Sequence, residues 1–179
     1  ESGKYQKALD LINAARTYPK NLGEGKLPIA KENDLDYYTA AVYRELGQND
    51  KAEKYFKKAA AGSEDMSDTL YYNDQPAHMI FYQGLALREL GEKNEAKSKF
   101  NALYDYGEKH FFDEVEIDYF AVSLPDFLVF DADLEEKNKI HCKYLMGLSL
   151  IAEGKKKESE KMFNYVKEKA LYHKGIKRE

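Results

Sequence analysis

The stretch ELGQNDKAEKYFKKA, residues 45–59, recurs twice in altered form along the chain. Its counterparts are ELGEKNEAKSKFNAL, residues 89–103, and AEGKKKESEKMFNYV, residues 152–166. In each copy a Gly precedes a small residue by five positions, and a Phe follows that small residue by four. Self-similarity at a fixed spacing is the sequence sign of a repeat architecture. These three stretches therefore decide the fold.

The similarity extends upstream of each stretch and back to the start of the sequence. A small residue recurs twelve positions before the small anchor of each copy, at Ala40, Gly84 and Gly147. The opening residues ESGKYQKALDLINAA also fit, with the apolar positions Ala8, Ile12 and Ala15. The four anchors lie at 8, 52, 96 and 159, so the steps are 44, 44 and 63 residues.

Each unit reads as two helices joined by a Gly turn. The Gly ends the first helix by taking a left-handed conformation, and the second helix carries apolar residues at helical spacing. The small residue on the first helix allows its partner to approach closely. One such hairpin cannot bury its apolar stripe alone, so the hairpins must stack. The sequence predicts an all-α fold.

The pattern resembles the tetratricopeptide repeat family, which has small, Gly, Ala and Phe residues at the same positions of its unit. The resemblance implies one domain over 1–179, a right-handed superhelical stack of hairpins (an α-solenoid). Its parts are a partial repeat at 1–22, repeats at 33–66, 77–110 and 140–173, and a long insertion at 111–139. The unit-ending Pro of the family is missing from the complete repeats. Because the first repeat lacks most of its leading helix, we expect the chain to be a fragment of a longer protein.

The insertion differs in composition from the repeats. Residues 113–136 contain nine acidic residues and no Lys or Arg, interleaved with apolar residues. The pattern fits a helix or a short buried strand, and a helical reading is favoured because Pro125 can begin a helix after Ser123. Residues 118–154 look like the C-terminal repeat region of bacterial multidomain proteins that carry an uncharacterised carbohydrate-enzyme-like module. That resemblance implies a bacterial origin and an accessory role in a carbohydrate-active enzyme.

Composition excludes several classes of protein. The formal charge of −4 argues against nucleic-acid binding, which needs a clustered positive field. No apolar run approaches the ~18 residues of a membrane span, so we expect a soluble protein without membrane contact. A single Cys fits a reducing compartment, and hence the cytoplasm. The 15 Tyr and 9 Phe, with no Trp, are more aromatic rings than a small core usually takes, so some of them are candidates for binding.

The family resemblance implies that the first helices line a concave, peptide-binding surface. Carried over position by position, the column Tyr37, Phe81 and Tyr144 is aromatic throughout, which suits a protein or peptide, another domain of the same chain, or a sugar face. The candidate binding residues are Tyr37, Tyr38, Arg44, His78, Phe81, Tyr82, Arg88, His141 and Tyr144. The alternative is that the insertion, or a following helix, covers the column.

The repeated arginines and histidines are less specific indications of a binding site than the aromatic column. Arg44 and Arg88 could grip an acidic partner, but more often such residues pair with a neighbouring Glu such as Glu45 or Glu89. His78 and His141 occupy equivalent positions, yet a metal site would need a further ligand on the same face.

No catalytic motif or cofactor site is predicted. Cys142 reads as a buried structural thiol. The stretch from Asp131 to Glu135 resembles a calcium loop but lacks its Gly, so it reads as a helix cap. We therefore expect a non-enzymatic interaction scaffold that binds no cofactor. The apolar stripe of the partial repeat, Ala8, Ile12 and Ala15, predicts a possible homodimer.

Overall fold

The computed structural model describes residues 2–18, 21, 30–66, 75–114, 133–170, 173 and 175, and these residues are helical with no strand. The helices are, in order, α1 (Ser2–Ala15), α2 (Asn33–Glu45), α3 (Asn49–Ala60), α4 (Met79–Glu89), α5 (Lys93–His110), α6 (Leu134–Ala152) and α7 (Lys156–Lys169). The predicted all-α fold class is confirmed for this part of the chain. None of the described helices is long and apolar enough to cross a membrane.

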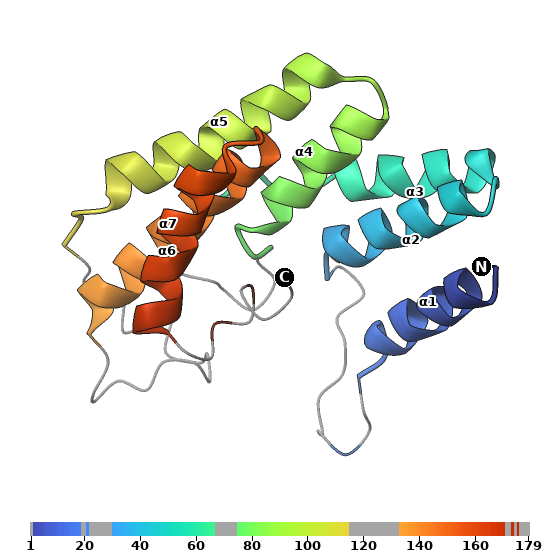
Figure 1. Ribbon diagram of the computed structural model, residues 1–179, viewed down its shortest axis with the longest axis horizontal. Coiled ribbons are helices and arrows are strands. Elements are labelled where there is room, and N and C mark those ends of the chain that lie inside the picture. Colours follow the sequence, from blue (N-terminus) through green and yellow to red (C-terminus); the bar gives the residue numbers. More distant parts are fainter. Residues whose placement is uncertain are drawn as a thin grey trace.

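Three helical hairpins follow one another along the molecule: α2 with α3, α4 with α5, and α6 with α7 (Figure 1). Each is closed by one glycine in the left-handed region, with φ values of 71° at Gly47, 88° at Gly91 and 78° at Gly154. A side chain is strained in that region, so glycine ends the first helix at the lowest cost. The predicted Gly turns are confirmed.

The core of each hairpin is the repeated Phe on its second helix. Phe56, Phe100 and Phe163 are 4%, 4% and 3% exposed. A Cβ atom on Gly84 would lie 2.5 Å from Cε1 of Phe100, and one on Gly147 would lie 2.5 Å from Cε1 of Phe163. The predicted small residues therefore allow each Phe ring to approach the backbone of the first helix. Burying such a ring contributes about 2–3 kcal/mol.

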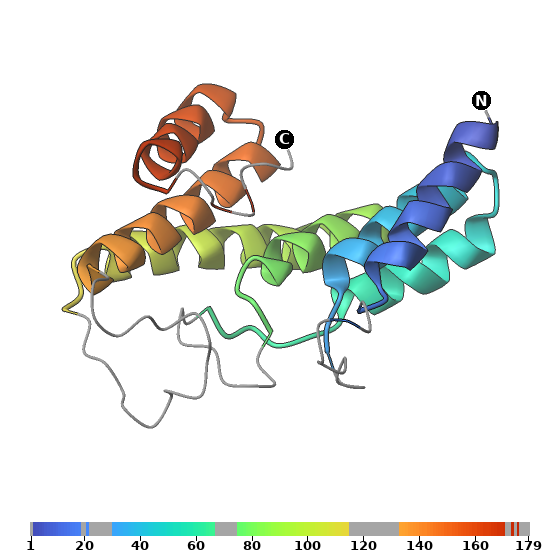
Figure 2. The same cartoon turned by 90° about the horizontal axis from the view of Figure 1, so that it is seen from below.

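Successive hairpins contact through a regular set of neighbours. The second helix of one hairpin packs against the first helix of the next, α3 on α4 and α5 on α6. The first helices also contact one another in series, α2 with α4 and α4 with α6. The helices α2, α4 and α6 therefore follow one another along the molecule, and Figure 2 shows the same ribbon from a second direction.

Helix α1 packs against α2 and is held there by Arg16. Its guanidinium donates to Glu32 (2.8 Å), Asp36 (2.8 Å) and Thr39 (3.2 Å). Burial lowers the pKa of Arg16, but the carboxylates of Asp36 and Glu32 more than offset this and hold that pKa above its ordinary value. The charged form of Arg16 is thus favoured between the two helices.

The buried face of α1 differs from the predicted stripe. Leu9 is buried at 8% exposed, Ala8 and Ile12 are only half-buried, and Ala15 and Leu11 are exposed. In the complete hairpins the positions equivalent to Ala8, Ile12 and Ala15 are buried because the preceding helix covers them. Among the described helices α1 packs against α2 alone, and Leu9 is the apolar side chain that α1 buries.

The insertion lies mostly outside the described residues, so its predicted helical conformation cannot be compared with the structure. Its end does fall within them: α6 begins at Leu134, six residues before the predicted start of the last repeat at 140. Asp133 caps this helix by accepting a hydrogen bond from the backbone N–H of Glu136 at 2.9 Å. Glu135 and Glu136 lie in the first turn, where their negative charges interact favourably with the positive end of the helix dipole. The predicted capping role is confirmed for Asp133.

Candidate binding surface

Four aromatic side chains from α2 and α4 form one continuous cluster, here called the aromatic face: Tyr37, Tyr38, Phe81 and Tyr82. The ring centroids of Tyr38 and Tyr82 lie 5.7 Å apart, and those of Tyr37 and Tyr82 lie 6.1 Å apart. Within each helix the neighbours are equally close, at 5.8 Å for Tyr37 and Tyr38 and 5.3 Å for Phe81 and Tyr82. These distances lie in the range of favourable edge-to-face contacts. The contact of α2 with α4 thus brings together four predicted site residues.

Two rings of the aromatic face pack on the hairpin cores, and a third ring is exposed to solvent. Tyr37 lies 5.8 Å from Phe56, and Phe81 lies 6.2 Å from Phe100, so the hairpin cores support both rings. Tyr38 is 45% exposed, an unusual value for a large ring within such a cluster. Its hydroxyl lies 3.4 Å from that of Tyr82, and either group could donate. The surface therefore offers an exposed ring beside a pair of hydroxyl groups.

The hydroxyl groups of Tyr37 and Tyr82 remain neutral at physiological pH. Burial raises the pKa of Tyr82 well above its ordinary value, and the hydrogen bond to Tyr38 raises it further. The carboxylate of Asp34 acts in the same direction. Burial and the carboxylate of Glu89 also raise the pKa of Tyr37, against a smaller lowering by Arg44 and Arg88. A neutral phenol both donates and accepts hydrogen bonds. The aromatic face can therefore recognise polar backbone groups as well as apolar side chains.

Arg44 and Arg88 occupy equivalent positions and make equivalent contacts. Each guanidinium lies 5.5 Å from the centroid of a core ring, Arg44 over Phe56 and Arg88 over Phe100. Each also reaches the end of the first helix of the next hairpin. Arg44 forms an ion pair with Glu89, which confirms the expected Glu pairing.

For Arg88 the expected Glu partner is wrong. Its Nη1 instead donates to the backbone carbonyl of Ala152, at 2.9 Å. A backbone acceptor carries no residue-type signal, so the sequence could not identify it. In the third hairpin Ile151 stands at the equivalent position, where it is 38% exposed.

The third member of the predicted column, Tyr144, is buried at 8% exposed. Its ring lies 6.2 Å from His78, 6.1 Å from Phe163 and 4.5 Å from His173. Gly175 also lies against its hydroxyl, so closely that a Cβ atom there would overlap it. In the described structure residues after α7 cover Tyr144, whereas the sequence suggested the insertion or a following helix. His173 and Gly175 were missed because they lie beyond the last repeated position.

His141 and Cys142 make their contacts with other residues of the fold. His141 Nε2 lies 2.9 Å from the carbonyl oxygen of Met66, and its ring lies 6.1 Å from that of Tyr106. Cys142 is fully buried, with its Sγ 3.5 Å from Oδ1 of Asn138. Among the described residues, no three His, Cys, Asp or Glu side chains gather in a way that could hold a metal ion.

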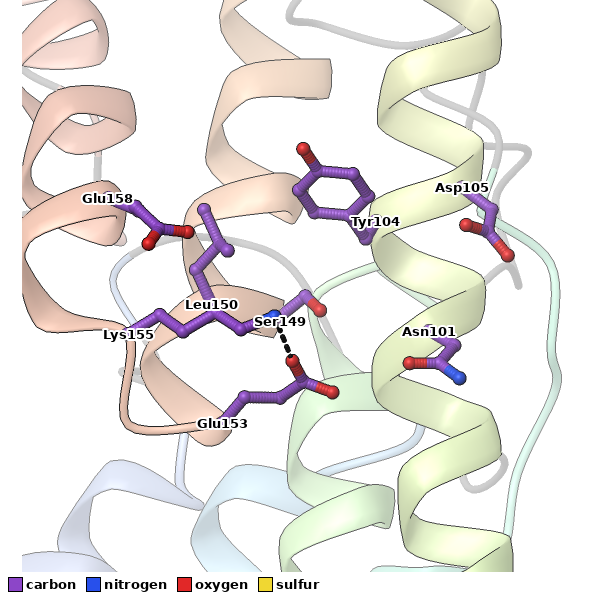
Figure 3. Close-up of a pocket in the computed structure, with 8 residues that line it drawn as sticks. All are labelled: Asn101, Tyr104, Asp105, Ser149, Leu150, Glu153, Lys155 and Glu158. Atoms are coloured by element: carbon purple, nitrogen blue, oxygen red, sulfur yellow. Dashed lines mark ion pairs between the residues drawn. The ribbon is translucent and has the colours of Figure 1, made fainter.

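A cleft that the sequence did not predict lies between α5, α6 and the start of α7 (Figure 3). This cleft has a volume of about 250 Å³. Its lining residues are Asn101, Tyr104, Asp105, Ser149, Leu150, Glu153, Lys155 and Glu158. Lys155 and Glu153 pair at 2.6 Å across its edge. The only sequence signal is that Asn101, Tyr104 and Asp105 share one helical face.

The comparisons with known proteins do not add to this geometry. No family model matches the chain, and no solved structure matches it.

Proposed function

We propose that this chain is a non-enzymatic scaffold of tetratricopeptide-like hairpins arranged as a right-handed superhelical stack. Two observations support the arrangement. Each hairpin closes with the same left-handed Gly, and the first helices α2, α4 and α6 contact one another in series. In a stack of this kind each repeat contacts only its neighbours, and the first helices share one surface.

The scaffold binds an extended segment of a protein partner, or of another domain of the same chain, on the aromatic face. The observation that carries this proposal is the ring of Tyr38, 45% exposed within a cluster in which the rings of Tyr37 and Phe81 rest on the hairpin cores. Rings with few rotatable bonds give large contact areas at low entropic cost, and Tyr is enriched at the energetic centres of interfaces. The paired hydroxyls of Tyr38 and Tyr82 add hydrogen bonds to the backbone of the bound segment.

The contacts that Arg44 and Arg88 make within the chain reduce their availability for an acidic ligand. Arg44 pairs with Glu89, and Arg88 binds the carbonyl of Ala152, so both guanidinium groups already have partners within the chain. An acidic ligand would have to displace these contacts. Recognition therefore depends chiefly on the rings and hydroxyls, and we expect weak dependence of binding on salt.

The test is a selection of binders from a random peptide display library on the full chain. Enriched peptides should lose at least about tenfold in affinity, roughly 1.4 kcal/mol, on the double variant Tyr38→Ala and Tyr82→Ala. The matched control replaces Tyr43 and Tyr55, a second stacked pair with centroids 5.6 Å apart, outside the aromatic face. Circular dichroism checks that both variants remain helical. Equal loss of affinity in both would show that the binding does not use the aromatic face.

A second candidate is an accessory role in a bacterial carbohydrate-active enzyme, with the same surface touching glycan. The exposed ring of Tyr38 beside two hydroxyls is the feature that favours it, because sugars pack on aromatic rings and hydrogen-bond at their edges. A panel of immobilised oligosaccharides distinguishes the two. Glycan binding that the Tyr38→Ala variant abolishes, with no peptide enriched, favours the second candidate.

Self-association through α1 stays a prediction. Leu11 on this helix is 62% exposed, and Ala15 beside it is exposed as well. Sedimentation over a range of concentrations should show a dimer that Leu11→Glu converts to a monomer. A strict monomer at high concentration contradicts it.

A further inference from the structure

The cleft between α5, α6 and the start of α7 lies where two hairpins meet, and an equivalent junction exists one repeat earlier, between α3, α4 and α5. The two junctions can be compared position by position, because Gly91 and Gly154 close the α4–α5 and α6–α7 turns in the same way. At the earlier junction Ala60, Ala86 and Leu90 belong to one apolar cluster. That junction is therefore packed with apolar side chains.

At the later junction the three equivalent positions hold residues with polar groups. In the same order they are Tyr104, Ser149 and Glu153, and all three line the cleft. An aromatic ring and two polar side chains cannot reproduce the close packing of two alanines and a leucine. The change of residue type at equivalent positions therefore explains why a polar cleft of about 250 Å³ opens at this junction.

The floor of the cleft contains a buried hydroxyl group. Ser149 is 3% exposed, and Leu150 beside it is 5% exposed. The Ser149 hydroxyl makes no hydrogen bond with any residue in the described part of the chain. Ser159, which is also buried, instead donates to the carbonyl of Gly147 at 3.0 Å. A buried polar group without a partner is unfavourable, so Ser149 offers a ligand a donor and an acceptor that the described fold leaves unused.

The rim of the cleft carries more negative than positive charge. Asp105, Glu153 and Glu158 contribute carboxylates, and Lys155 is the one cation among the lining residues. The ammonium group of Lys155 pairs with Glu153 at 2.6 Å, as the dashed line in Figure 3 shows. Asp105 and Glu158 form no ion pair with the residues that the structure describes. The charge of two of the three carboxylates is therefore uncompensated.

We propose that this cleft binds a small aliphatic ligand through an ammonium group. Glu158 accepts charge-assisted hydrogen bonds from the ammonium, and the Ser149 hydroxyl accepts a further one. The ring of Tyr104, which points from α5 toward α6 (Figure 3), and the side chain of Leu150 give the methylene chain apolar contacts. Asn101 on the α5 side of the rim provides another oxygen acceptor.

Two sources supply this chemistry, a free diamine or the lysine side chain of a partner protein. The site goes beyond the proposed function, because it shares no residue with the aromatic face. The alternative is a crevice that holds only water, with acidic residues on a solvated rim. A water-filled crevice does not distinguish a charged chain from a neutral chain of the same length, whereas an ammonium site does.

The experiment follows backbone amide shifts of the full chain by nuclear magnetic resonance. The probes are a four-carbon diamine with an ammonium group at each end, the four-carbon diol of the same length, and lysine blocked at both backbone ends. We expect the diamine to shift amides in residues 101–105 and 149–158, with an affinity at least about tenfold above that of the diol. Binding should weaken as salt is raised. Equal shifts from diamine and diol, or no shifts in these residues, overturn the proposal.

The probes also separate the two sources. Binding of the diamine with no binding of the blocked lysine supports a free ligand. Binding of the blocked lysine with at least equal affinity supports the lysine side chain of a partner. Both outcomes support the ammonium site.

The first variant copies the earlier junction into the later one, as Ser149→Ala with Glu153→Leu. These are the residues that already pack together between α3 and α4, so we expect the variant to remain helical by circular dichroism. It removes the buried hydroxyl and releases Lys155 from its pair, so diamine binding should be lost. Unchanged diamine binding in a helical variant overturns the proposal.

A second variant tests the charge without altering the packing of the floor. Glu158→Gln keeps the shape of an exposed side chain and should lower diamine affinity at least about tenfold. The matched control is Glu95→Gln, because Glu95 occupies the equivalent place in the first turn of α5 and is exposed as well. The control should leave the affinity unchanged. Equal loss in both variants overturns the proposal, since the diamine would then respond only to the net charge of the protein.

Discussion

At the scale of single residues, close approach of the repeated Phe depends on the absence of a side chain at Gly84. We predict that Gly84→Val lowers the free energy of unfolding by about 1–3 kcal/mol, because its branched side chain would press into the ring of Phe100. Urea unfolding followed by circular dichroism measures it. The matched control is Gly3→Ala in α1, an open position where Ala should be neutral or slightly stabilising. Equal stability of the Gly84 variant would contradict the packing argument.

The raised pKa of Tyr82 makes a prediction about alkaline pH. Its neutral form is favoured in the folded state, so this contribution to stability is fully present below the unfolded pKa of about 10 and is lost as the pH rises above it. We therefore predict that the urea midpoint falls between pH 8 and pH 11, and that it falls less in Tyr82→Phe. An identical fall in both proteins would mean that Tyr82 ionises equally easily in the folded and unfolded chains.

The sequence predicted best those residues whose role repeats. Gly47 and Phe56 each have a counterpart in two further copies, so their turn and core roles follow from the pattern itself. The contacts of Arg88 and Tyr144 could not be predicted, because their partners are a backbone carbonyl and two residues outside the repeats. Of the nine candidate site residues, the structure gathers Tyr37, Tyr38, Phe81 and Tyr82 into one surface, since α2 and α4 are in contact.

At the scale of elements, α1 depends on polar contacts because it contributes few buried apolar side chains. We predict that Arg16→Met, which keeps the apolar stem but removes the charge, costs on the order of 1–2 kcal/mol and exposes the amides of α1 to faster hydrogen exchange. Asp36, which is only 8% exposed, would then keep fewer partners for its charge. Lys57→Ala, which breaks the exposed pair with Glu53, is the control and should leave exchange of α1 unchanged. If both variants behave alike, the Arg16 contacts do not hold the helix.

The rotation of α1 illustrates why an element can be predicted without its orientation. Helical periodicity identified α1 and its apolar positions, but which face is buried depends on the neighbouring helices. With α2 as its observed neighbour, Leu9 is buried and Ala15 is not. In the described structure α1 contacts α2 alone, whereas α3, α5 and α7 each pack against the first helix of their own hairpin.

At the scale of the whole molecule, the order of contacts predicts that stability varies along the chain. Because each hairpin contacts its neighbours, damage to one end should spread only gradually to the other. We predict that Phe56→Ala, costing about 3–5 kcal/mol locally, raises hydrogen exchange in α2 and α3 far more than in α7, and that Phe163→Ala does the reverse. Mass spectrometry of peptic fragments measures this. A uniform rise in both variants would show that the chain unfolds as a single cooperative unit.

The guanidinium contacts also bear on how such a chain could be lengthened. Arg44 and Arg88 each tie one described hairpin to the next, and the equivalent position on α6 holds Ile151, whose apolar side chain is 38% exposed. A further unit copied from residues 77–110 and joined after α7 would meet no such tie. Changing Ile151 to Arg in the lengthened protein would supply the guanidinium that joins the other hairpins, so the added unit should be held more stably.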